Sequence, residues 1–422
     1  MISLSIIRQH PDIVKDGIKK KSSTVSISEI LNLDEKNRAL QHEIDEMRAE
    51  RNRASEAIGN AKRQGKNADG AIESMRQLGD TLKSLETEAG AIKMALNALL
   101  DQVPNMPHES VPSGNDDTGN VIVREWGDMP DFDYEPRNHT TLGESLELFD
   151  MARGSKISGS GFPLYTGKGA ELERRLINTM LDHHKREYHF TEIYPPVLML
   201  EESMRTTGQL PKFEEDMYHT ELDHLYLAPT AEVPVTNIHR NEILNEDDLP
   251  INYVAYSPCF RRESGSYGKD TRGLLRVHQF NKVELVKFTT PESSYDELES
   301  LTTQAESVLQ ELQLTYRVVE LCTSDLSFAA AKCFDLEVWA PGEMKWLEVS
   351  SCSNFEDFQA RRGQIRYRHS SDKKVGYVHT LNGSGLATPR LMVALLETYQ
   401  NKDGNINFPD PVADFLGIGE IS

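Results

Sequence analysis

Residues 258–288 read PCFRRESGSYGKDTRGLLRVHQFNKVELVKF: an apolar strand, a polar loop with three glycines, and a second strand of alternating character. This pattern predicts a β-hairpin whose charged residues lie over one face of a sheet. Arg261, Arg276 and Glu284 stand among apolar neighbours, and a buried charge is costly unless it is paired or binds a ligand. The stretch therefore indicates a ligand site, with a solvent-exposed basic hairpin as the alternative.

The sequence lacks the two glycine-rich loops that most often hold nucleotide phosphates. It contains no G-x-x-x-x-G-K-[ST], and no G-x-G-x-x-G opens a helix. We therefore expect arginines to hold any phosphate, because the planar guanidinium group binds phosphate oxygens bidentately.

Two further segments fit a nucleotide site. In Trp346–Ser351 (WLEVSS), strand alternation predicts Glu348 and Ser350 on one face, with Ser351 at the turn. A carboxylate and a hydroxyl beside polyphosphate suit Mg²⁺, although a surface strand end would look the same. In Thr380–Arg390, a loop of small residues is predicted to run into a helix whose first turn carries Arg390, and a positive helix end with an arginine attracts phosphate.

The N-terminal part carries two heptad seams, over residues 30–61 and 75–99, separated by a glycine-containing break at 64–70. They predict two long helices folded back as an antiparallel coiled coil, roughly 50 Å long at ~1.5 Å per residue. A dimerisation coiled coil or a spacer is the simpler interpretation. Phosphate binding is favoured by a basic cluster of Arg48, Arg51, Arg53, Lys62, Arg63 and Lys66.

Composition limits the remaining possibilities. The net charge of −21 argues against a protein that coats nucleic acid non-specifically. The sequence contains neither a secretory signal nor an apolar run long enough to span a membrane. Its four cysteines show no zinc-like spacing, and they are expected to be reduced thiols in a cytoplasmic protein.

Two domains are expected in a chain of 422 residues. We predict a helical coiled-coil arm over 1–105, a linker with little regular structure over 106–135, and a catalytic domain over 136–422. Few strands of the last region are joined by crossover helices. The predicted fold is therefore α+β, with a mostly antiparallel sheet flanked by helices.

The three segments resemble the signature motifs of class II aminoacyl-tRNA synthetases. The first motif ends at Pro195–Pro196, the second is Phe260–Glu263 with its loop and exit strand, and the third is the helix entry at Gly385–Arg390. More narrowly, PTAE (229–232), DTRGL (270–274), HQFNKVE (278–284) and NGSG (382–385) resemble the seryl-tRNA synthetases of bacterial type. The resemblance covers essentially the whole chain.

The resemblance implies a role for each motif residue. The implied ATP site comprises Arg261, Arg262, Glu263, Arg276, Val277, Phe280, Glu348, Val349, Ser350, Ser351 and Arg390, of which Arg261 and Arg390 are catalytic. Arg261 would bridge the amino-acid carboxylate and the α-phosphate, Glu263 would accept from the adenine amino group, Phe280 would stack on adenine, and Arg390 would hold the terminal phosphate. Glu348 and Ser351 would bind Mg²⁺, and no zinc is expected.

The implied serine site comprises Thr230, Ala231, Glu232, Arg261, Glu284 and Ser384. The implied partners are L-serine, ATP, tRNA(Ser), tRNA(Sec) and a second copy of the chain. The commoner family pattern differs at Arg262, at Ser264 and before Arg390, where Thr388–Pro389 stands, but no required group is lost. The alternatives are a ligase that loads a carrier protein, whose members lack the arm and usually carry zinc, and a non-catalytic RNA-binding relative, which would have lost Arg261, Glu284 or Arg390.

Overall fold

The computed structural model describes residues 1–264 and 272–422. It divides into two compact units, one formed by residues 2–104 and the other by Met1 together with residues 105–422. Among the described residues, no helix is long and apolar enough to cross a membrane.

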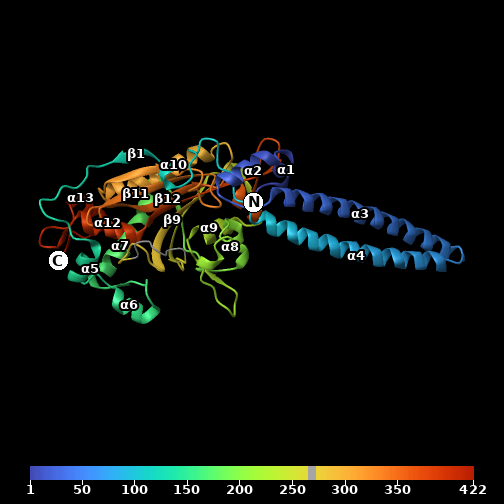
Figure 1. The fold of residues 1–422 in the computed structure, drawn as a ribbon, viewed down its shortest axis with the longest axis horizontal. Helices are drawn as coiled ribbons and strands as arrows, with labels where there is room; N and C mark the ends of the chain where they lie inside the picture. The colour runs from blue at the N-terminus through green and yellow to red at the C-terminus, as the bar shows by residue number, and fades with distance from the viewer. Residues whose placement is uncertain (265–271) are drawn as a thin grey trace. The chain divides into compact units, whose positions relative to one another are not determined.

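The first unit is helical. It consists of α1 (Leu4–Gln9), α2 (Pro11–Lys20), α3 (Ile27–Arg63) and α4 (Asp69–Leu100). Ser26 caps α3 by accepting a hydrogen bond from the backbone N–H of Glu29 at 3.2 Å. Helices α3 and α4 run side by side (Figure 1), and Ile44, Leu82 and Ala89 pack between them with Leu40, Met47 and Leu85. These residues belong to the two heptad seams, so the predicted helical hairpin is confirmed.

The second unit is built on an eight-stranded sheet, with strand order β1-β10-β11-β12-β15-β9-β8-β4. All neighbouring pairs are antiparallel except β4 and β8. The predicted α+β fold with a mostly antiparallel sheet is therefore confirmed. The strands are β1 (Val121–Trp126), β4 (Thr191–Ile193), β8 (Ile251–Phe260), β9 (Gln279–Thr289), β10 (Tyr316–Glu320), β11 (Lys332–Ala340), β12 (Lys345–Asn354) and β15 (His379–Ala387).

Three long helices lie along this sheet (Figure 1). Helix α7 (Gly167–Tyr188) packs on β8 and β9, α10 (Ser294–Glu311) on β15 and β12, and α12 (Thr388–Thr398) on β11 and β12. Their apolar sides share one core with the sheet, which includes Leu176, Val283, Leu301, Leu336 and Leu391. This core fixes the strands that carry the site.

Shorter elements complete the unit. The helices are α5 (His139–Ser145), α6 (Met151–Ser158), α8 (Glu201–Thr207), α9 (Glu232–Thr236), α11 (Phe358–Gly363) and α13 (Asp410–Leu416), with 3₁₀ turns at Asp117–Gly119, Glu214–Asp216, Asn237–His239 and Glu246–Asp248. The strands are β2 (Phe149–Asp150), β3 (Leu164–Tyr165), β5 (Leu198–Met199), β6 (Tyr226–Leu227), β7 (Ile243–Asn245), β13 (Arg366–Arg368), β14 (Val375–Tyr377), β16 (Ile406–Asn407) and β17 (Glu420–Ile421).

The structure differs from the sequence-based expectation at two places. Residues 106–135, expected to have little regular structure, contain β1, which pairs with β10 at the sheet edge. The turn-forming residues around Val121–Trp126 dominate the local composition and hide this short strand. Residues 382–385, expected as a loop, belong to β15 between β9 and β12. A Cβ on Gly383 would lie 2.9 Å from Cys352 Sγ, so the small residue is needed for strand packing.

Candidate active site

A cavity of about 570 Å³ is lined by residues of β9, β12 and β15 and by Arg261, which directly follows β8. It is lined by twelve of the residues expected in the ATP and serine sites: Thr230, Glu232, Arg261, Glu263, Arg276, Val277, Phe280, Glu348, Val349, Ser351, Ser384 and Arg390. Segments far apart in the sequence thus meet because β12, β15, β9 and β8 are successive strands of the sheet.

Arg261 lies just beyond the end of β8, beside Phe280 of β9. The two meet because Cys259 pairs with Phe280 in the β8–β9 register. The guanidinium carbon lies 5.3 Å from the centre of the Phe280 ring, and Nε donates a hydrogen bond to the carbonyl oxygen of Pro229 at 3.3 Å. The cationic end of Arg261 is therefore fixed between the hairpin and the turn that carries Thr230.

Glu263 is held in a left-handed conformation, with φ of 53°. Its carboxylate forms an ion pair with the guanidinium of Arg276. Asp216 secures both neighbours: its carbonyl oxygen accepts from Arg262 N–H at 2.9 Å, and its carboxylate accepts from Ser264 N–H at 2.9 Å and from the Ser264 hydroxyl. Asp216 was not among the expected site residues, although it also lines the cavity.

Arg390 lies in the first turn of α12 and lines the cavity. Its Nη1 donates to the carbonyl oxygen of Glu348 at 2.9 Å and lies 3.5 Å from that residue's carboxylate, while Nε donates to the carbonyl oxygen of Leu275 at 3.2 Å. The arginine thus bridges β12 and the segment that leads into β9.

The face of β12 toward the cavity carries Glu348 and Ser351, rather than Glu348 and Ser350 as expected. The β11–β12 register shifts between Leu336 and Glu337, so that Leu336 faces Ser350 and Glu337 faces Glu348. This bulge inserts Val349 and reverses the alternation beyond it. Ser350 is buried behind the cavity, where its hydroxyl donates to the carbonyl oxygen of Ser384 at 2.7 Å.

Asp335 of β11, a residue that no sequence motif indicated, lies opposite Ser351. Burial raises the pKa of Asp335 well above its usual range, and the charge of Glu348 raises this pKa further, while a hydrogen bond with Ser351 opposes the shift. Two carboxylates and a hydroxyl are oxygen ligands of the kind that Mg²⁺ prefers.

Two buried carboxylates, Glu232 and Glu284, share a hydrogen-bond donor. Asn382 Nδ2 donates to both, at 3.1 Å to Glu232 and 3.0 Å to Glu284. Gln359 donates to Glu232 at 2.6 Å, and the Thr230 hydroxyl donates to Glu284 at 2.9 Å. Gln359 and Asn382 were not expected in the site, because the sequence does not show which carboxylate an uncharged amide side chain will contact.

The two carboxylates differ in their access to the cavity. Glu232 lines it, whereas Glu284 is fully buried and does not. The ammonium group of Lys282 lies 2.5 Å from Glu284 Oε2, so every oxygen of Glu284 has a partner. Burial and then the charge of Glu284 raise the pKa of Glu232 to about 7.

Two other expected residues also lie outside the cavity lining. Ala231 packs in a hydrophobic cluster with Val286 and Phe288, and the Arg262 guanidinium lies over the ring of Tyr218, 5.6 Å from its centre. Asp270 and Thr271 of the DTRGL motif lie outside the described residues.

Comparison with known proteins supports the resemblance. Residues 1–107 match the family model of the seryl-tRNA synthetase N-terminal domain, and residues 212–399 match that of the tRNA synthetase class II core domain (G, H, P, S and T). A serine–tRNA ligase of Carboxydothermus hydrogenoformans is 52% identical over 421 residues, which cover 100% of this chain and 99% of the relative.

Solved structures agree over the full length. Seryl-tRNA synthetase from Pyrococcus horikoshii, complexed with ATP, superimposes with a TM-score of 0.92 at 38% identity, covering 100% of this chain and 99% of that one. The cytoplasmic serine–tRNA ligase of Naegleria fowleri, in complex with AMP, gives 0.87 at 26% identity with the same coverage. The chain therefore belongs to the seryl-tRNA synthetases, the serine–tRNA ligases of class II.

Proposed function

We propose that this chain activates L-serine with ATP to seryl-adenylate and transfers the seryl group to tRNA(Ser), with tRNA(Sec) as a second substrate. The observation that carries the proposal is the polarity of the cavity. Arg261, Arg276, Arg390 and Glu232 all line it, and Arg261 lies close enough to Glu232 to lower its pKa. An amino acid bound between them would present its ammonium group to Glu232 and its carboxylate to Arg261.

In the first step, a carboxylate oxygen of serine attacks the α-phosphorus of ATP, a P–O bond forms, and pyrophosphate leaves. Two anions must approach, so a fixed cation between them lowers the barrier without covalent catalysis. Arg261 supplies that cation, and Arg390 holds the terminal phosphate. Phe280 offers its ring face to adenine, and Glu263 accepts a hydrogen bond from the adenine amino group.

Mg²⁺ is proposed to bind at Glu348 and Ser351, where it would neutralise phosphate charge. The donor set fits, because Glu348 and Ser351 share a face of β12 and Asp335 lies opposite Ser351. Arg276, Val277 and Val349 would complete the walls of the nucleotide site.

Specificity for serine is assigned to the Glu284 end, together with Ser384. Because Glu284 contacts Thr230, Asn382 and Lys282 in the chain alone, a serine hydroxyl would replace one of these contacts or donate to a group that Glu284 orients. Alanine lacks the hydroxyl that would make this contact and is therefore expected to be rejected strongly. Threonine would be excluded only because the space beside the serine side chain is small.

We assign tRNA binding to the helical arm of residues 1–105 and catalysis to residues 136–422, joined by residues 106–135. Arg48, Arg51, Arg53, Lys62, Arg63 and Lys66 of the arm are all exposed, as phosphate contacts require. A homodimer formed through the first motif and a cytoplasmic location are parts of the same proposal.

The test is ATP–pyrophosphate exchange with a panel of amino acids, followed by aminoacylation of tRNA(Ser) and tRNA(Sec). Serine should support exchange far above alanine and threonine, and Arg261→Ala should lower serine-dependent exchange by about a thousandfold, as expected when a central charge-stabilising group is lost. Equal exchange with serine and alanine would refute the assignment of the substrate.

A further inference from the structure

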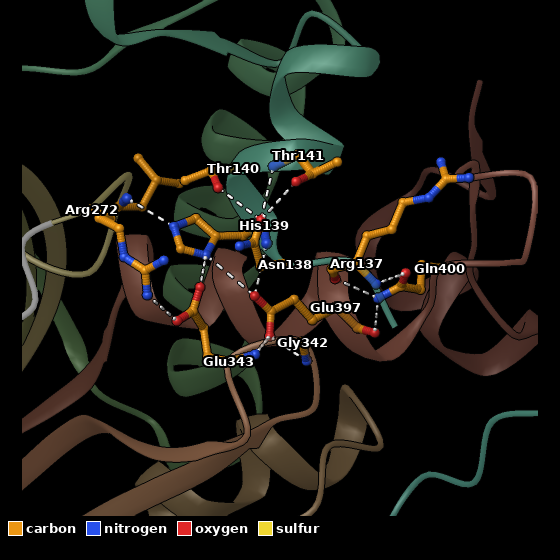
Figure 2. A network of polar contacts seen from close by, with 11 residues as sticks. Arg137, Asn138, His139, Thr140, Thr141, Arg272, Gly342, Glu343, Glu397 and Gln400 are labelled. Carbon is orange, nitrogen blue, oxygen red and sulfur yellow. Dashed lines mark hydrogen bonds and ion pairs between the residues drawn. The ribbon is translucent and has the colours of Figure 1, made fainter. Parts of the chain in front are cut away.

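A buried histidine outside the cavity connects two parts of the nucleotide site. His139, the first residue of α5, is fully buried, and its Nδ1 lies 3.2 Å from Glu397 Oε1 and 3.3 Å from Glu343 Oε1 (Figure 2). The sequence assigned no role to His139, Glu343 or Glu397.

The tautomer of His139 follows from its other nitrogen. The backbone N–H of Leu274 donates to Nε2 at 3.1 Å, so Nε2 carries the lone pair and the ring proton lies on Nδ1. Nδ1–H therefore donates toward the two carboxylates. The three side chains offer a cation ligands within 4.8 Å of one another, but a cation on Nδ1 would require a proton on Nε2, directed at the Leu274 N–H. The geometry therefore favours a hydrogen-bonded cluster over a metal site. We call His139, Glu343 and Glu397 the hub, because the segments on both sides of His139 are bonded to them.

One side of this hub holds the turn of residues 272–275. Arg272 forms an ion pair with Glu343 at 3.4 Å, and Leu274 N–H is bound by His139. Gly273 has a φ of +55°, and a Cβ there would lie 2.3 Å from His139 Nε2, so the ring also fixes the position of the backbone. Leu274 and Leu275 line the cavity.

The other side of the hub is the last turn of α12. Glu397 accepts from the His139 backbone N–H at 2.8 Å through Oε1, and from the N–H groups of Gly342 and Glu343 at 2.9 and 3.0 Å through Oε2 (Figure 2). The first turn of the same helix carries Arg390, which donates to the carbonyl oxygen of Leu275 at 3.2 Å. The 272–275 turn is thus tied to α12 at both ends of the helix.

We propose that His139 is a positioning residue of the nucleotide site: by accepting from Leu274 N–H and donating to Glu397, it sets the 272–275 turn against α12, so that Arg276 and Arg390 lie at the cavity in a fixed relation. This assignment rests on the proposed ATP site and adds to it a residue that does not touch the substrates.

Two substitutions separate the two hydrogen bonds. In His139→Gln the side-chain amide reaches the position of Nε2 and can still accept from Leu274. In His139→Asn the shorter amide reaches the position of Nδ1 and can donate to Glu397, but Leu274 N–H is left without an acceptor. In serine-dependent ATP–pyrophosphate exchange, we expect His139→Asn to raise KM for ATP about tenfold and His139→Gln less than threefold, because an unpaired buried N–H is costly. KM for serine should change less than twofold in both.

Thermal unfolding of the same full-length variants serves as the control. A purely structural role would lower Tm in both variants and shift both Michaelis constants together, which would overturn the proposal. Equal KM values for ATP in the two variants would overturn it as well. A rise of Tm with Mn²⁺ or Zn²⁺ alone, present in the wild type and lost in His139→Gln, would replace it with a metal site. Absence of serine-dependent exchange in the wild type would instead contradict the proposed function.

Discussion

Glu232 offers a direct test of how the site binds its amino acid. Its pKa is raised to about 7 because the side chain is buried and lies near the charge of Glu284. The ionised carboxylate binds the serine ammonium group much more strongly than the neutral acid does, because it carries the opposite charge and both of its oxygens can accept. The ability of the free enzyme to bind serine should therefore rise with pH. With a pKa of about 7, roughly one tenth of Glu232 is ionised at pH 6 and roughly nine tenths at pH 8.

The expected result is an increase of about tenfold in kcat/KM for serine between pH 6 and pH 8, since kcat/KM reports the ionisation of the free enzyme. The measurement is ATP–pyrophosphate exchange at saturating ATP. The matched measurement, kcat/KM for ATP at saturating serine, should stay nearly constant, because bound serine already holds Glu232 ionised. Glu232→Gln should be slower and should lose the dependence on pH.

The same pKa predicts the direction in which the stability of the fold changes with pH. The folded chain keeps the Glu232 proton at pH values where the unfolded chain, with a pKa near 4.5, has released it. The free energy of unfolding should therefore fall as pH rises from about 4.5 to about 7, and Glu232→Gln should remove this contribution. A change of less than twofold in kcat/KM for serine across pH 6 to 8, or the same slope in Glu232→Gln, would refute the reasoning.

Three further predictions concern other contacts. Asp216→Ala should raise KM for ATP about fivefold to tenfold and leave KM for serine unchanged in the exchange assay, because Ser264 N–H loses its acceptor next to Glu263; a parallel rise in both constants would contradict this. Asp34 accepts two hydrogen bonds of 2.7 Å from the half-exposed Arg8, which lower its pKa, so Asp34→Asn should destabilise the helical unit by about 1 kcal/mol in thermal melts near neutral pH. This difference should vanish as the pH falls below the usual range of an aspartate, and an unchanged melt at pH 7 would exclude the contribution. Three exposed basic residues of the arm, Arg51, Arg63 and Lys66, can be exchanged together for glutamate. The variant should have a KM for tRNA raised at least about tenfold, a weaker salt dependence of tRNA binding and unchanged pyrophosphate exchange. Unchanged tRNA charging would contradict a role of the arm in tRNA binding.

The large features of the fold follow from local pattern. The heptad seams predict α3 and α4 because apolar residues at steps of three and four must lie on one side of a helix. The β8–β9 hairpin follows from two alternating strands around a polar loop, and the register from Cys259 and Phe280 onward places Arg261 beside Phe280. Motif order along the chain identifies the family, although it does not by itself give distances.

What pattern misses depends on contacts between distant segments. The bulge opposite Leu336 cannot be inferred from WLEVSS alone, because it arises in the pairing of β12 with β11; strict alternation therefore assigns Ser350 to the face that Ser351 occupies. Asp335 enters the site only through that same pairing. His139 shows the same limit, since Leu274 and Glu397 lie 135 and 258 positions away from it in the sequence.

In the chain alone, two of the three arginines that line the cavity are paired with acidic residues. Arg276 pairs with Glu263, and Arg390 contacts Glu348. Partly buried charges need such partners when no ligand is present, since an unpaired one is costly. ATP binding is then an exchange of ion pairs: phosphate oxygens replace the carboxylates around the arginines, while Glu263 becomes available to adenine and Glu348 to Mg²⁺. Removing either carboxylate therefore has two opposing effects: a contact to the nucleotide or metal is lost, and an arginine is released to bind phosphate. Substitution of the carboxylate should therefore raise KM for ATP less than substitution of the arginine with which it pairs.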